Sequence, residues 1–150
     1  MKNIFDEVVN NEVLARINTL SNESQPTWGK MDVAQMLAHC SVAYDGVYDD
    51  ARPPAKGFKK FLLKLFIKKI VVGDKPYKKN SRTAPEFLIV DKRDFNTEKE
   101  RLITYLNKTQ ELGGSHFDGK ESQSLGPLTL DEWSNMFYKH LDHHLTQFGV

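Results

Sequence analysis

The chain has 150 residues, of which 39% are hydrophobic and 27% are charged, and these values fit one globular domain over residues 1–150. Its net charge of +1 gives no argument for a nucleic-acid partner, and its single cysteine, Cys40, excludes an internal disulfide and fits a reducing compartment. Asp6 and Glu7 precede any long apolar run, and no stretch approaches the roughly 18 apolar residues of a membrane span. We therefore expect a cytoplasmic protein without a signal peptide.

The first third of the sequence predicts two helices. Apolar residues at helical spacing predict a helix over residues 3–20, and a polar, proline-containing loop follows at 21–26. Asp32 and Gln35 have the spacing of a capping box, in which each side chain binds the other residue's backbone N–H. This motif predicts that a second helix begins here and covers residues 32–45.

The middle of the sequence predicts a basic helix and a more polar one. Residues 58–72 are very apolar and rich in lysine, and we expect a third, amphipathic helix there. A loop with two prolines is expected over 73–85. A fourth helix is expected over 94–112, with Thr97 and Glu100 as a candidate capping box.

The last helix has the clearest boundaries. A loop rich in glycine and serine is expected over 113–126, and Thr129 and Glu132 form the third candidate capping box. A helix is therefore predicted over 129–148, with Gly149 ending it. Because no long segment alternates with period two, we predict an all-α protein: a four-helix bundle with the basic helix as an additional element.

Two histidines in the last predicted helix have the spacing of metal ligands. His140 and His144 lie four residues apart, so they share one face of the helix and are able to bind one ion. His143 falls off that face and is not expected to be a ligand. The same spacing also arises by chance, in which case the two rings are hydrogen-bonded core residues. Both fall on an apolar stripe made of Leu130, Trp133, Phe137, Leu141, Leu145 and Phe148.

A third ligand is needed for a catalytic zinc site with one open position. His39, in the second predicted helix, is a candidate, but its position does not single it out from Cys40, His116 or the carboxylates. Cys40 lies at the centre of the apolar stripe of its helix and is expected to be a small buried hydrophobe. His116 lies in the Gly-rich loop and is expected to face solvent.

Four segments together resemble the DinB-like (DinB/YfiT) superfamily, in a branch described as a domain of unknown function. One is Trp28-Gly-Lys-Met-Asp-Val-Ala-Gln-Met-Leu-Ala-His39. The others are the two ends of the last helix, Leu-Thr-Leu-Asp-Glu-Trp133 and His140-Leu-Asp-His-His144-Leu-Thr-Gln-Phe-Gly149, and the middle segment Lys75-Pro-Tyr-Lys-Lys-Asn-Ser-Arg-Thr-Ala-Pro85. The resemblance spans nearly the whole chain, with the motifs in the family's order and spacing.

This resemblance implies an up-down four-helix bundle that holds one divalent metal ion, zinc, nickel or iron, with three histidines. The ligands that match the family's motifs are His39, His140 and His144. It also implies frequent homodimers and, among characterised relatives, metal-dependent thiol transferases and a thiol-dependent isomerase. A low-molecular-weight thiol is therefore an expected co-substrate, although no motif matches a particular thiol pocket.

The basic segment admits two interpretations. Residues 56–82 carry a net charge of +9, so the rest of the chain carries −8. Lys60, Lys64 and Lys68 share one helical face, and apolar residues spread widely over the remainder. We expect 58–72 to be mainly structural, covered by the other helices or by a second subunit. Contact with an anionic membrane surface, or attraction of anionic substrates or RNA, is the alternative.

Two functions follow from these patterns. The first is a metal-dependent enzyme acting on a small molecule, as a hydrolase or a thiol transferase, because three neutral imidazoles leave the ion its full charge. The second is a non-catalytic binding protein with a structural or vestigial metal site. No general base is predicted: Tyr44, Asp45 and Glu132 are polar candidates without a distinguishing pattern.

Overall fold

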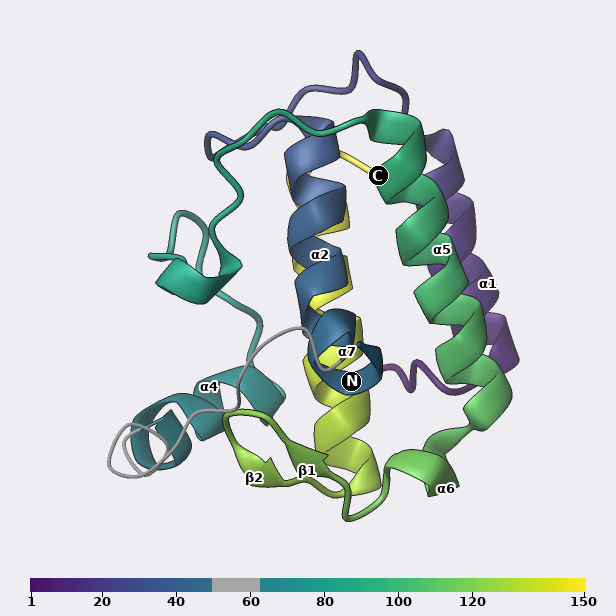
Figure 1. The fold of residues 1–150 in the computed structure, drawn as a ribbon, viewed down its shortest axis with the longest axis vertical. Coiled ribbons are helices and arrows are strands. Elements are labelled where there is room, and N and C mark those ends of the chain that lie inside the picture. Colours follow the sequence, from purple (N-terminus) through teal and green to yellow (C-terminus); the bar gives the residue numbers. More distant parts are fainter. Residues whose placement is uncertain (50–62) are drawn as a thin grey trace.

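Four long helices pack against one another in the computed structural model, which describes residues 1–49 and 63–150. They are α1 (Glu7–Thr19), α2 (Val33–Tyr48), α5 (Phe95–Leu112) and α7 (Leu130–Gln147). Helix α5 packs on α1 and α2, and α7 packs on the same two helices (Figure 1). The prediction of a mostly helical protein is confirmed.

The remaining elements are short. A π-helical turn, Leu63–Ile67, leads directly into α4 (Lys68–Val72). A 3-10 turn at Pro85–Phe87 lies within the α4–α5 connection, residues 73–94. The predicted loop at 113–126 in fact contains one helical turn, α6 (Gly114–Phe117), and the strands β1 (Glu121–Ser122) and β2 (Gly126–Pro127), which pair antiparallel.

Two of the three predicted capping boxes are confirmed, and one is wrong. Asp32 with Gln35 starts α2, and Thr129 with Glu132 starts α7; both bonds of each box are present. Helix α5 instead begins after Asp94, whose side chain accepts from the backbone N–H of Thr97. Aspartate caps a helix in the same way as threonine, so the correct cap lies three residues before the predicted one.

Aromatic side chains fill the centre between α2 and α7. Tyr44 and Phe137 stack with ring centroids 4.5 Å apart, and Trp133 and Phe117 continue the cluster. These four side chains are fully buried, and such burial contributes roughly 1.5–3 kcal/mol for a large apolar side chain. The packing fixes the rotation of α7 about its axis, which points His140 and His144 toward α2.

Only part of the basic segment is described, because residues 58–62 lie outside the described range. From Leu63 onward the segment is helical, as predicted. The expectation that the other helices cover its apolar arc is wrong for the described part, where only Val72 is buried. Within residues 1–49 and 63–150, no helix is both long and apolar enough to cross a membrane.

Candidate metal centre

Three histidine rings meet between α2 and α7. His39 comes from the middle of α2, and His140 and His144 come from successive turns of α7. The ring centroids are 4.6–4.9 Å apart, and one ring nitrogen from each histidine lies within 4.8 Å of those of the other two. The structure thus brings together the three histidines that the resemblance selected. They form the one such cluster of His, Cys, Asp or Glu in the described part of the chain.

Hydrogen bonds orient two of the three rings. Nδ1 of His39 lies 2.8 Å from the backbone carbonyl of Phe87, and Nδ1 of His144 lies 2.8 Å from Oε1 of Gln147. A carbonyl oxygen only accepts, so each Nδ1 must carry the proton and donate it. In the neutral ring the proton on Nδ1 leaves a lone pair on Nε2. Both Nε2 atoms therefore carry the electron pair that a metal ion requires.

The third ring completes the cluster through its own Nε2. Nε2 of His140 lies 2.9 Å from Nε2 of His39. Because the His39 nitrogen carries the lone pair, His140 must donate its Nε2 proton to it. A metal ion held by all three Nε2 atoms would require that proton to move to Nδ1 of His140, which changes the tautomer without releasing a proton.

Gln147 is held firmly enough to act as a fixed acceptor. Its Nε2 donates to the carbonyl of Trp28 at 2.6 Å, so its Oε1 must face His144. Its backbone carbonyl accepts from both the backbone N–H and the hydroxyl of Thr27. The loop approaches this closely because residue 29 is glycine with φ of +87°, and a Cβ there would collide with the Gln147 amide.

Burial makes all three histidines poor bases. Desolvation lowers the pKa of His144 to about 3, with the neighbouring His39 as the next cause. Burial first, and then His39 and His144, hold the pKa of His140 well below its ordinary value. Burial also lowers the pKa of His39. Without an ion, the three rings are thus neutral at pH 7, the form that coordinates metal.

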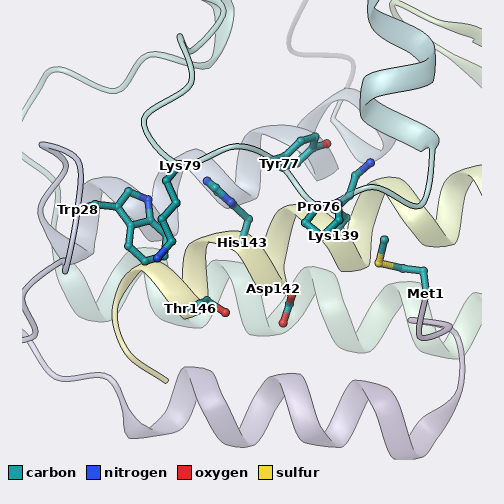
Figure 2. A pocket seen from close by; sticks show the side chains of 9 residues that line it. All are labelled: Met1, Trp28, Pro76, Tyr77, Lys79, Lys139, Asp142, His143 and Thr146. Carbon is teal, nitrogen blue, oxygen red and sulfur yellow. The ribbon is translucent and has the colours of Figure 1, made fainter.

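His143 also lies on α7, with its ring 5.0 Å from that of His144, but it is not part of the three-histidine cluster. Its ring lies against Trp28, 5.9 Å between centroids, and against Tyr77 at 5.6 Å. These side chains border a hollow of about 170 Å³, which none of the three clustered histidines lines (Figure 2). The hollow is lined by Met1, Trp28, Pro76, Tyr77, Lys79, Lys139, Asp142, His143 and Thr146.

Other candidate residues have different roles. Cys40 is buried and contacts the Met36 sulfur, and His116 is exposed, as expected for both. Asp45 forms an ion pair with Arg101, and Glu132 pairs with Lys68 besides capping α7. Both carboxylates are therefore occupied, and neither is positioned as a free base.

Sequence reasoning missed the two groups that orient the ligands. Gln147 lies three residues after His144, and this spacing alone was a usable signal because i and i+3 are neighbours on a helix. The acceptor for His39 is a backbone carbonyl 48 residues away in sequence, in the α4–α5 connection. Any residue at position 87 provides that carbonyl, so no side-chain pattern was able to reveal it.

Comparison with known proteins assigns the chain to a family. The sequence matches the family described as "Protein of unknown function (DUF1569)" over residues 6–149. No curated protein and no solved structure matches the chain. The match covers nearly the whole chain and includes all three clustered histidines. The protein therefore belongs to the DUF1569 family of proteins of unknown function.

Proposed function

We propose that His39, His140 and His144 bind one divalent metal ion through their Nε2 atoms. The observation that carries this proposal is the pair of hydrogen bonds to Phe87 and Gln147, which leave a lone pair on Nε2 of His39 and of His144 in a cluster whose ring nitrogens lie within 4.8 Å of one another. Metal-bound histidines characteristically donate their other ring N–H to such acceptors. Three imidazoles suit zinc, nickel or iron, and they do not select strongly among these ions.

We further propose that the protein is a DinB-like four-helix bundle and a metal-dependent enzyme. The mutual packing of α1, α2, α5 and α7, with the ligands on α2 and α7, supports the relationship. A divalent ion with three neutral ligands keeps its charge and lowers the pKa of a bound water or thiol. The reaction class is hydrolysis or thiol transfer on a small molecule, and the hollow beside His143 offers space for one.

The metal proposal is tested by titrating metal-stripped protein with zinc and cobalt. We expect one ion per chain, and a cobalt absorption spectrum typical of nitrogen ligands. His144→Ala should abolish stoichiometric binding. The matched control is His143→Ala, one position away on the same helix, which should bind like the wild type. Equal affinity in the two variants would refute the site.

A second experiment separates the enzyme from a non-catalytic binding protein. The metal-loaded protein is assayed with activated esters, and with a low-molecular-weight thiol plus an alkylating electrophile. Turnover that disappears in His144→Ala and on chelation supports the enzyme. A metal whose removal unfolds the protein, with no turnover in either assay, supports a structural role instead.

A further inference from the structure

Four large apolar side chains are exposed within six residues of the basic segment. Leu65 is 58% exposed, Phe66 63%, Ile67 40% and Ile70 59%. We call these four residues the 65–70 patch. Isolated exposed apolar residues are common on protein surfaces, but a contiguous group marks an interaction site.

Polar contacts with α7 hold α4 in place, and the side chains of the 65–70 patch are exposed. The buried Lys139 ammonium of α7 donates to the backbone carbonyls of Ile70, at 2.7 Å, and Gly73. Asn135 donates to the carbonyl of Val72 at 3.0 Å. An ordinary surface helix buries its apolar face and exposes its polar one. Here Val72 is buried and α7 binds backbone carbonyls of α4 and Gly73, while the four side chains of the patch remain exposed.

Basic residues lie within the patch segment and follow it along the chain. Lys69, Lys75 and Lys78 are exposed, as are Arg82 and Lys79, whose ammonium lies over the Trp28 ring, and Asp74 is the one acid between residues 63 and 82. Lys68 pairs with Glu132 of α7. The described segment lies at one edge of the molecule, away from α1 and α5 (Figure 1). An apolar strip with lysines beside it matches an anionic bilayer, whose headgroups bind cations and whose interface accepts apolar side chains.

We propose that the 65–70 patch and its lysines dock the protein on an anionic lipid bilayer, as a peripheral contact. A polyanion such as RNA would engage the lysines and leave Phe66 and Ile70 in water. A second copy of the chain meeting this surface about a two-fold axis would bring the two basic segments together, and like charges repel. The bilayer satisfies both the apolar and the basic groups.

Vesicle flotation with the full chain tests the proposal. We expect binding to phosphatidylcholine vesicles that contain phosphatidylglycerol, no binding to phosphatidylcholine alone, and weakening with added salt. Phe66→Ser with Ile70→Ser should reduce partitioning by at least about tenfold, since insertion scales with buried apolar area. Both side chains are exposed, so this variant should fold.

The matched control is Val8→Ser with Val90→Ser, two side chains that are 71% and 84% exposed outside the patch. The control should bind vesicles like the wild type. Three results would overturn the proposal. The first is that the protein does not bind anionic vesicles. The second is that the Phe66/Ile70 variant and the control variant bind them equally. The third is that, without lipid, the wild type and the control sediment as dimers and the Phe66/Ile70 variant as a monomer. The last result would assign the patch to self-association.

Discussion

Gln147 fixes the orientation and the tautomer of His144. Its Oε1 lies 2.8 Å from Nδ1 of His144, and its own amide nitrogen is bound to the carbonyl of Trp28. The chain therefore links the end of α7, the loop before α2 and the histidine cluster through one amide. This linkage makes the cluster sensitive to residues that never approach the three Nε2 atoms.

Removing the Gln147 amide should weaken metal binding while leaving all three histidines in place. In Gln147→Leu, Nδ1 of His144 loses its acceptor, and we expect affinity for zinc to fall roughly 10–100-fold. The control is Gln110→Leu on α5, which should bind normally. Competition with a chromophoric chelator measures both affinities. An unchanged affinity in Gln147→Leu would show that packing alone orients the ring.

A methyl group at residue 29 should affect the cluster through the same amide. Gly29 and Gly119 both have positive φ, +87° and +74°, but only at residue 29 would a Cβ collide with Gln147. We expect Gly29→Ala and Gly119→Ala each to lose roughly 1–2 kcal/mol of stability from the backbone conformation. Only Gly29→Ala should also lose zinc affinity. Equal zinc affinity in the two variants would argue against the linkage.

The metal-free protein should lose stability as the pH falls. The pKa of His144 is about 3 in the folded chain and near 6.5 when unfolded, so below pH 6.5 the unfolded state binds more protons. The stabilisation that results from keeping such a histidine neutral is fully present above pH 6.5. It declines as the pH falls toward 3, by up to roughly 1.4 kcal/mol per pH unit for each such histidine. Urea unfolding at a series of pH values measures it.

The pH prediction has an internal control. Replacing His39, His140 and His144 together by leucine removes the titrating groups and should flatten the dependence between pH 6.5 and 4. Excess zinc should raise the stability by a nearly constant amount over this range and leave the slope unchanged, because the ion binds the folded cluster, which is already unprotonated there. If the stability of the triple leucine variant fell with pH as steeply as that of the wild type, the titrating groups would lie elsewhere in the chain.

A buried cluster of charged side chains should contribute more to folding stability than an exposed ion pair. Asp45 on α2 and Glu98 on α5 are each 5% exposed, and both pair with Arg101. Arg101→Ala leaves these carboxylates with fewer partners, and we expect a loss of about 2 kcal/mol in urea unfolding. Lys2→Ala breaks the exposed pair with Glu12 and should leave stability near the wild-type value. Similar losses in the two variants would contradict this ranking.

The sequence by itself determined the long helices and their ends. Helical periodicity and two capping boxes located α2 and α7 to within a few residues, because caps and apolar spacing act over a few positions along the chain. The i, i+4 spacing of His140 and His144 likewise placed both on the buried face. The choice of His39 came from the family resemblance, since many side chains on other elements were equally eligible.

Only the tertiary structure decided what surrounds the ligands and the basic segment. The carbonyl of Phe87 and the amide of Gln147 became second partners of the histidines because separate segments fold over α7. Apolar spacing predicted a helix at 58–72 covered by the other helices or by a second subunit; in the single chain Phe66 is exposed, while Lys139 binds the backbone carbonyl of Ile70. Contacts between distant segments depend on packing of the whole chain, which local sequence patterns do not encode.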